Sequence, residues 1–301
     1  MEVLVDASGP LTFPPSEVVD QKLKDKDGKP ANEDEDVGKN LSTCKVLTAD
    51  GTVMNQDDRF LELVQQYSMP TDKAGSLQRR PSSVGVTLEQ YAQKHVHGFD
   101  RLLSMEPIDG WTFKTEQDGT KVYVKQVEGS PLISFKGVCD ISVDEGGLAK
   151  LLNNILNVEA RPKWDEMCME GRTLETYVPF YRYTRARMKS PAFVISNREL
   201  CLLGRIRFEA DGGALVAVQS DDHPDAPSGS DFVRCDMQVG GYIIRPKVGS
   251  EKVFTVVWTG KLDPKGWLPT WLVNHVAWKQ ALSLAKFRKA LLDNTLDVRA
   301  A

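Results

Sequence analysis

Arg161 and Asp165 are the two residues whose types and spacing best fit the chemistry of ligand binding. Pro162 follows Arg161, and proline is favoured at the first position of a helix, so a helical turn is expected to begin there. Arg161 would then lie at the helix cap, with Asp165 in the first turns. A helix N-terminus with an arginine beside it binds phosphate, and a buried arginine requires a nearby carboxylate. The pair is therefore a candidate phosphate site, and the alternative is a surface ion pair four residues apart on a helix.

Residues for catalysis or metal binding do not form a recognisable set in this sequence. The four histidines, His95, His97, His223 and His275, match no metal-binding spacing such as HExxH. A GxSxG nucleophile motif and a glycine-rich phosphate loop are also missing. The five cysteines are scattered without a CxxC pair, which argues against a disulfide framework or a structural zinc. We therefore expect no enzymatic activity, no metal and no cofactor.

Charge is distributed unevenly along the chain. Residues 1–83 contain 15 acidic and 10 basic residues, whereas the remainder contains 27 acidic and 28 basic residues. A nearly neutral remainder gives no reason to expect binding to nucleic acid. The sequence shows no signal-peptide pattern and no apolar run approaching the roughly 18 residues of a membrane span. A cytoplasmic location is therefore expected.

Composition divides the chain into three parts. Residues 1–83 are predicted to be a largely disordered acidic extension, because charged residues, Gly and Asn dominate much of it and cannot bury enough apolar surface to fold. Within this extension, residues 59–67 are a candidate short helix. Residues 84–294 are predicted to form the folded domain, and residues 295–301 a short C-terminal tail.

The folded domain is predicted to belong to the α+β class. A helix over residues 88–105 is followed by strands between 111 and 141, with a hairpin signal at Asp118-Gly119. A short helix is predicted over residues 144–157. Further strands are predicted over residues 173–178, 181–188, 199–209, 214–220, 232–239, 242–246 and 252–262. Their short connections favour a large antiparallel sheet.

A long C-terminal helix is predicted over residues 271–292, a stretch without Gly or Pro. Its apolar side is wide, so the helix should bury much of its circumference. The apolar side contains Val273, Ala277, Ala281, Leu284, Phe287 and Leu291, with Trp271 and Trp278 at its flank. The other side contains His275, Lys279, Ser283, Lys286 and Lys289.

The order of these elements and four short motifs resemble the START (steroidogenic acute regulatory protein-related lipid transfer) domain family. The motifs are Trp164-Asp165, Ser196-Asn197-Arg198-Glu199, the segment 241–246 (GYIIRP) and the segment 263–269 (DPKGWLP), of which the last is the most specific. The resemblance covers residues 84–294 and is nearest to phosphatidylcholine-transfer-protein-like members. It implies a helix-grip fold, in which a curved antiparallel sheet wraps around the C-terminal helix and encloses a tunnel for one lipid.

The resemblance also implies roles for individual residues. Arg161 and Asp165 match the positions that contact the lipid phosphate in phosphatidylcholine-transfer-protein-like members, so they are the expected head-group site. The expected tunnel lining consists of Trp164, Gly204, Gln238, Trp271, Val273, Ala277 and Leu284. The aromatic residues that surround choline in that relative do not carry over, because Leu200 and Gln238 stand at or near their positions. A preference for choline is therefore not implied.

One further position bears on the ligand. Many relatives have an inward-pointing arginine six residues after the arginine of the SNRE-type motif. In this chain Gly204 occupies that position, and Arg205 is predicted to point the other way. This difference disfavours a sterol as the ligand.

Residues 190–195 (SPAFVI) form an apolar run in a predicted loop, where polar residues are the norm. In the family this loop covers the tunnel mouth, so we expect it to open at a membrane and insert Phe193. The expected gate and membrane contacts are Phe193, Val194, Ile195, Trp267, Trp271, Lys279 and Lys286. Each lysine near an anionic surface contributes about 1 kcal/mol to binding. The alternatives are a loop that packs on the helix and a helix face that is merely solvated.

Taken together, these features predict a non-enzymatic protein that binds one phospholipid and transfers it between membranes. It is expected to be a monomer that contacts membranes peripherally and transiently. A sterol or another hydrophobic ligand is the alternative within the same fold. A lipid-sensing scaffold that recruits partners through its extension, or a helix-grip enzyme, is the alternative of another class.

Overall fold

The computed structural model describes most of the predicted folded domain. The described residues are 45–47, 53–55, 97–143, 146–177, 181–190, 195–229, 231–250, 252–266, 268–293 and 295–296. The candidate helix over 59–67 and the gate residues Phe193, Val194 and Trp267 lie outside this set. Most of the predicted tail, residues 297–301, also lies outside it.

Two short strands occur within the extension that we predicted to be largely disordered. β1 (Lys45–Leu47) pairs antiparallel with β2 (Val53–Asn55). The sequence between them contains Asp50-Gly51, a pair typical of hairpin turns that the prediction from composition overlooked.

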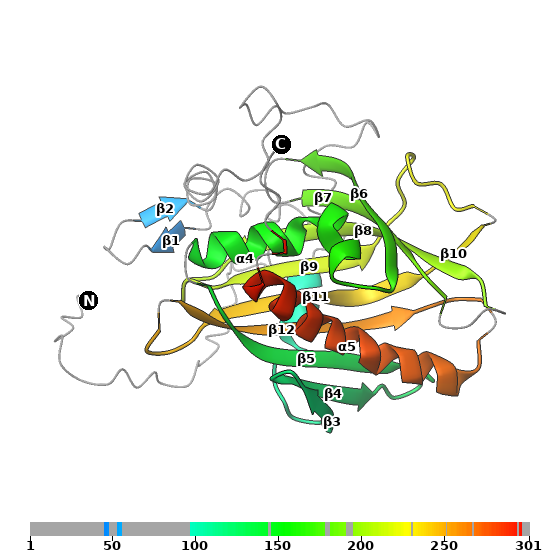
Figure 1. Cartoon of the computed structure of the whole chain (residues 1–301), viewed down its shortest axis with the longest axis horizontal. Coiled ribbons are helices and arrows are strands. Elements are labelled where there is room, and N and C mark those ends of the chain that lie inside the picture. Colours follow the sequence, from blue (N-terminus) through cyan, green and yellow to red (C-terminus); the bar gives the residue numbers. More distant parts are fainter. Residues whose placement is uncertain are drawn as a thin grey trace, which may run out of the picture. The chain divides into compact units, whose positions relative to one another are not determined.

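A ten-stranded sheet forms the body of the domain (Figure 1). Its strands are β3 (Thr112–Gln117), β4 (Thr120–Gln126), β5 (Ile133–Ser142), β6 (Cys168–Tyr177), β7 (Tyr181–Met188), β8 (Asn197–Phe208), β9 (Ala214–Ser220), β10 (Phe232–Arg234), β11 (Asp236–Pro246) and β12 (Val253–Asp263). Their order is β3-β4-β5-β12-β11-β9-β8-β7-β6, and β10 pairs with β8. Every pair along that order is antiparallel, whereas β10 runs parallel to β8. The predicted antiparallel sheet is confirmed, with this one parallel addition.

The segment predicted as one strand over 232–239 is divided in the structure. β10 ends at Arg234, whereas β11 begins at Asp236 and continues through the separately predicted strand over 242–246. Gly241 permits this continuity, because its φ is +151° and a Cβ there would lie 2.0 Å from the carbonyl oxygen of Val216 on β9. Only glycine allows so close an approach of two strands.

The long C-terminal helix α5 (Thr270–Leu292) lies across one face of the sheet (Figure 1). Leu284 and Phe287 on its predicted apolar side are buried in the core. Ser283, which we predicted on the polar side, is also buried. Its hydroxyl donates to the backbone carbonyl of Gln280 at 2.7 Å, which satisfies the buried polar group. The prediction of a helix gripped by an antiparallel sheet is confirmed.

The C-terminal half of α5 lies tightly against β5 at Gly137. A Cβ on Gly137 would lie only 2.6 Å from the carbonyl oxygen of Ala281 in the helix. Two turns further along α5, the Nε of Arg288 donates to the backbone carbonyl of Asp140 on β5 at 3.0 Å. The missing side chain therefore brings this half of the helix onto the sheet, whereas the N-terminal half borders open space.

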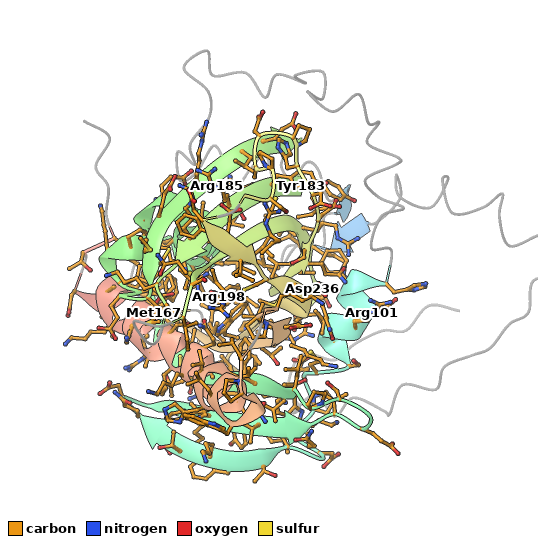
Figure 2. All side chains as sticks on the ribbon, turned by 90° about the vertical axis from the view of Figure 1, so that its right-hand side faces the viewer. Arg101, Met167, Tyr183, Arg185, Arg198 and Asp236 are labelled. Carbon is orange, nitrogen blue, oxygen red and sulfur yellow. The ribbon has the colours of Figure 1, made fainter. Side chains whose placement is uncertain are left out.

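Among the described residues, three shorter helices cover the two faces of the sheet. α4 (Gly147–Leu156) and the 3-10 helix η2 (Val158–Lys163) belong to the same hydrophobic core as α5. α3 (Gly98–Leu103), marked by Arg101 in Figure 2, covers the opposite face. Its Leu102 belongs to one hydrophobic cluster with Ile243 of β11. The face that carries α5 is therefore the inner face, and any internal site lies between α5, η2 and the sheet.

Candidate functional site

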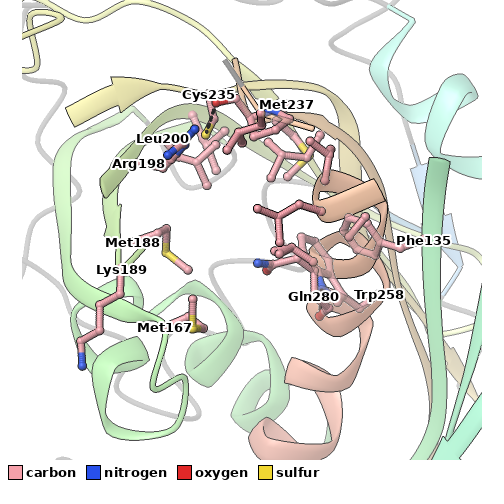
Figure 3. A pocket seen from close by; sticks show the side chains of 18 of the residues that line it. Phe135, Met167, Met188, Lys189, Arg198, Leu200, Cys235, Met237, Trp258 and Gln280 are labelled. Carbon is pink, nitrogen blue, oxygen red and sulfur yellow. Dashed lines mark hydrogen bonds between the residues drawn. The ribbon is translucent and has the colours of Figure 1, made fainter. Parts of the chain in front are cut away.

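A cavity, chamber A, lies between the N-terminal half of α5 and the inner face of the sheet (Figure 3). Its empty volume is about 960 Å³, including the part open to solvent. The wall is mainly apolar and includes Met188, Leu200, Met237, Trp258, Leu272 and Ala277. A space of this size with such walls is suited to hydrocarbon.

A second cavity, chamber B, lies beneath α4 and η2 and has an empty volume of about 820 Å³, counted in the same way. Its wall includes Trp164, Arg182, Gly204, Val218 and Tyr242. Arg161, Leu202 and Trp258 belong to the walls of both chambers. The two chambers therefore adjoin at these three residues.

Arg161 and Asp165 form an ion pair where the chambers meet. The Nε of Arg161 donates to Oδ2 of Asp165 at 2.9 Å, and Asp165 is only 3% exposed. The other carboxylate oxygen accepts from the backbone N–H of Met167 at 3.1 Å. Burial lowers the pKa of Arg161, but the charge and hydrogen bond of Asp165, together with Tyr242 and Cys168, raise it by more, so the pKa of Arg161 is raised overall. The interpretation of the pair as a surface contact is therefore wrong.

The local structure around this pair differs from the prediction. We expected a helix to begin at Pro162, but Pro162 is the second-last residue of η2, which runs from Val158 to Lys163. Asn157 caps that helix instead, because its side chain accepts from the backbone N–H of Ala160 at 3.1 Å. Arg161 and Asp165 therefore lie at the C-terminal end of a helical segment, and no helix N-terminus assists them in holding an anion.

Aromatic rings surround the junction of the chambers. Tyr242 stacks on Trp258 with ring centroids 4.6 Å apart, and the Trp258 indole N–H donates to the carbonyl of Gln280 at 3.1 Å. Burial raises the pKa of the Tyr242 phenol. Trp164 packs edge-on against Phe287, and its buried Nε1 has no hydrogen-bond partner among the described residues. The junction is therefore apolar apart from the ion pair and isolated N–H or O–H groups.

The predicted tunnel residues divide into two groups. Trp164 and Gly204 line chamber B, and Val273 and Ala277 line chamber A. Gln238, Trp271 and Leu284 line neither chamber.

Each of these three residues has a physical reason for its position. Gln238 lies at an irregularity in the pairing of β11, where Met237 takes the inward position and Gln238 is exposed. Trp271 is 71% exposed on the outer side of the first turn of α5. Leu284 packs within the core in the half of α5 that contacts β5. These three residues therefore lie outside the walls of chambers A and B.

Sequence reasoning missed two arginines in the chamber walls, Arg182 on β7 and Arg198 on β8. A signal was available for Arg198, because it alternates with Leu200 and Leu202 and therefore shares their inward face. Arg205 lies on the opposite face, as predicted, with its guanidinium 5.0 Å from the ring centroid of Phe99.

The described residues of the predicted gate do not gather at one place, because Trp271, Lys279 and Lys286 lie in the first turn, near the middle and in the C-terminal half of α5. Ile195 is partly buried, and Lys279 is exposed on the helix surface. Lys286 forms an ion pair with Glu166, which offsets its charge toward a membrane. Within the described residues there is no group of three potential metal ligands and no helix long and apolar enough to span a membrane.

Comparisons with known proteins agree with this geometry. An uncharacterised protein from Pseudomonas aeruginosa is 26% identical over 167 residues, which cover 55% of this chain and 78% of that protein. Human START domain-containing protein 10 is 26% identical over 170 residues, but these cover only 55% of each protein. The structure of human StAR-related lipid transfer protein 5 superposes with a TM-score of 0.61 at 20% identity, covering 69% of this chain and all of that one.

The strongest assignment comes from the family match, which spans most of the folded part. Residues 106–295 match the START domain, and this range includes both chambers and the Arg161–Asp165 pair. The similarity to the solved structure shows that the fold is shared. The chain belongs to the START domain family, whose members bind lipids and sterols and transfer them.

Proposed function

We propose that this chain binds one phospholipid in chambers A and B and carries it between membranes. The observation that supports this most is the buried Arg161–Asp165 pair at the junction of two apolar chambers. A phospholipid combines the same two features, since its hydrocarbon chains require apolar space and its phosphate requires a cation or hydrogen-bond donors. Arg161 has further N–H groups beyond the one given to Asp165, and these would bind the phosphate.

The free-energy balance of lipid uptake is consistent with a carrier. Burial of each CH₂ group is worth about 0.8 kcal/mol, so a lipid with about 30 of them leaves a bilayer only for an equally apolar cavity. Transfer between two such environments is nearly balanced, and the protein lowers the cost of crossing water. Because this process needs no nucleophile and no acid–base pair, we propose no enzymatic activity.

The lipid would enter and leave at the N-terminal end of α5. Trp271 is largely exposed there, while Leu272 and Val273 beside it line chamber A. A large exposed apolar side chain beside a cavity suits contact with a membrane. In this proposal the gate also includes Phe193, Val194, Ile195 and Trp267, and Lys279 adds attraction to an anionic surface.

The protein is proposed to act as a cytoplasmic monomer whose contact with membranes is peripheral and transient. A sterol carrier is the second candidate, because some members of the family bind sterols. Gly204 favours the phospholipid, since an inward arginine is missing at that position while Arg161 lies at the junction of the chambers.

Native mass spectrometry of the purified chain, followed by lipid extraction, tests the proposal. We expect one phospholipid per chain, and Arg161→Ala should lower both its occupancy and the rate of transfer between vesicles. Arg172→Ala, which removes an exposed arginine on β6, is the matched control and should change neither. A bound sterol would contradict the phospholipid assignment, and failure to take any lipid from liposomes would contradict the carrier function.

A further inference from the structure

The walls of the two chambers carry positive charge that is not matched by acidic residues. Arg161, Lys189 and Arg198 line chamber A, and Arg161 and Arg182 line chamber B. Among the described residues that line the chambers, none is Asp or Glu. Lys189 is exposed to solvent, so the charges that a ligand would meet inside are those of the three arginines.

Arg198 is the arginine with the least compensation. It is only 7% exposed, and it has no carboxylate within ion-pair distance in the part of the chain that the structure describes. Its guanidinium donates to the backbone carbonyls of Ser196 and, at 3.4 Å, of Lys265, while its buried Nε has no partner among the described residues. Neutral carbonyls solvate a cation but do not cancel its charge, so Arg198 can still bind an anion. Figure 2 shows Arg198 inside the fold, and Figure 3 shows it beside Leu200 and Cys235.

Arg182 presents the same arrangement in chamber B. Its Nη1 donates to the backbone carbonyl of Leu156 at 2.7 Å, and Glu159 acts on it only from beyond ion-pair distance. Burial lowers the pKa of both Arg182 and Arg198, in contrast to Arg161, whose pKa Asp165 raises. Asp165 therefore compensates one arginine of the three, and the cavity as a whole carries a net positive charge.

We propose that the two chambers select anionic phospholipids over zwitterionic ones, and that Arg182 and Arg198 recognise the negative charge. This inference rests on the proposed function, because it names the ligand class of the same chambers. In an apolar cavity the field of an unpaired guanidinium is weakly screened, so a ligand of net negative charge is favoured. The planar guanidinium also matches phosphate oxygens in geometry. The ammonium of a zwitterionic head group would meet no acidic side chain in the described walls.

The aromatic rings of chamber B could favour a different ligand, a lipid with a quaternary ammonium head group. Trp164, Tyr242 and Trp258 line this chamber, and aromatic faces bind quaternary ammonium groups. If these rings governed selection, the chain would retain choline lipids without any preference for anionic ones. The two chemistries therefore predict different lipid compositions in the bound state.

The test is a competition between lipids, measured on the protein after its separation from the vesicles. The full chain is incubated with vesicles of equimolar phosphatidylcholine and phosphatidylglycerol. The vesicles are then removed by flotation, and the lipid that remains bound to the protein is quantified by mass spectrometry. Analysis of the bound lipid, rather than of vesicle binding, separates cavity selection from attraction to an anionic surface. We expect the bound ratio of anionic to zwitterionic lipid to exceed the vesicle ratio by about tenfold, the effect of one charge-assisted contact.

Variants assign the selectivity to particular residues. Arg198→Gln and Arg182→Gln should each lower the enrichment several-fold, whereas Arg198→Lys should retain part of it. Arg207→Gln is the matched control, since Arg207 lies on β8 but on the outer face, where it pairs with Glu209 at 2.8 Å. Thermal unfolding of each variant checks the fold, and the wild-type ratio tests the inference even if a variant is unstable.

The possible outcomes distinguish a failure of the proposed selectivity for anionic lipid from a failure of the proposed carrier function. Equal retention of both lipids, or enrichment that survives both glutamine substitutions, would overturn the inference and leave the carrier function standing. A chain that retains no lipid would instead contradict the carrier function. A parallel arm with oleate in place of phosphatidylglycerol distinguishes carboxylate from phosphate, and preferential retention of oleate would overturn the assignment to a phospholipid.

Discussion

At the scale of single residues, the Arg161–Asp165 pair combines a structural and a ligand-binding role. Each partner makes burial of the other tolerable, because an isolated charge in this apolar junction would be strongly unfavourable. Arg161 is also part of the walls of both chambers, and only its Nε is shown to bond to Asp165. Substitution of one partner therefore affects stability and binding together, and only a paired substitution separates the two roles.

Asp165→Asn should lower the free energy of unfolding by about 3–5 kcal/mol, because it leaves Arg161 buried without a counter-charge. The double variant Arg161→Met/Asp165→Leu removes both charges and should recover most of that loss, yet retain little phospholipid. Urea denaturation measures the stability, and native mass spectrometry measures the bound lipid. Retention of phospholipid by the double variant at the wild-type level would show that the pair is structural only.

Lys136 is a buried residue whose pKa differs strongly from its ordinary value. It is fully buried on β5, where its Nζ donates to the carbonyls of Pro107 at 2.7 Å and Glu106 at 3.2 Å and lies 4.0 Å from the ring centroid of Trp111. Burial, together with the charge of Lys125, lowers its pKa from 10.5 to about 8. The folded state therefore releases this proton at lower pH than the unfolded state does.

This shift predicts a contribution to stability that increases with pH. Between pH 8 and 10.5 the unfolded state binds the Lys136 proton more tightly than the folded state does, so the free energy of unfolding should rise by up to about 3 kcal/mol across that window. Below pH 8 the contribution is constant. Lys136→Met should lack this rise, and the difference between the two proteins in urea denaturation at pH 7.5 and 9.5 isolates it from other titrating groups. A parallel pH dependence of both proteins would contradict the prediction.

At the scale of elements, the close contact between α5 and β5 decides where the cavity forms. Gly137 lets the helix lie against the strand near Ala281, so that only its N-terminal half borders chamber A. Gly204, by contrast, has room around it, since a Cβ there would lie 3.6 Å from its nearest neighbour. Gly137 therefore leaves no room for a side chain, whereas Gly204 does, although both lie at inward-facing strand positions.

Gly137→Ala should lower the free energy of unfolding by about 1–3 kcal/mol, because the added Cβ would displace the backbone of α5. Gly204→Ala is the matched control and should change stability by about 0.5 kcal/mol or less. Thermal and urea unfolding of both variants measure the effect. Equal stability of the two variants would show that the approach of α5 to β5 is not tight.

The proposed gate predicts a kinetic effect without a change in ligand. Phe193→Asp should slow lipid transfer between vesicles by about tenfold or more, since a carboxylate inserted into a bilayer is strongly unfavourable. The stoichiometry of bound lipid should stay the same. Val248→Asp serves as the control, because Val248 is fully exposed in the β11–β12 turn at the other end of the sheet from the start of α5. Transfer by Phe193→Asp at the wild-type rate would remove Phe193 from the gate.

At the scale of the whole molecule, the acidic extension and the START domain are expected to act separately. Deletion of residues 1–83 should leave lipid binding and the transfer rate between vesicles unchanged, because both chambers are built from residues of the domain. Transfer kinetics of the full chain and the truncated chain test this directly. Loss of transfer on deletion would instead assign the extension a part in the carrier function.

Much of the fold could be predicted because its signals are local. The strands over 181–188 and 214–220 match β7 and β9 residue for residue, since alternation with a period of two is visible within a single segment. The predicted start of α5 differs from the observed one by a single residue. The limits of this helix could be predicted because a turn precedes it and the helix contains no Gly or Pro. The division between β10 and β11 could not be predicted, because it depends on pairing with β8 and on the close approach of Gly241 to β9.

For the site, the sequence by itself determined which residues share a face of each strand, the opposite charges of Arg161 and Asp165, and most of the apolar side of the last helix. It identified Arg161 and Asp165, because their spacing and their motif are local. Only the tertiary structure decided that η2 ends at this pair, that Gln238 and Trp271 turn outward, and that Arg182 and Arg198 face the cavity. Which side of a strand or helix borders empty space depends on contacts between distant segments, and periodicity shows two faces without showing which of them encloses the ligand.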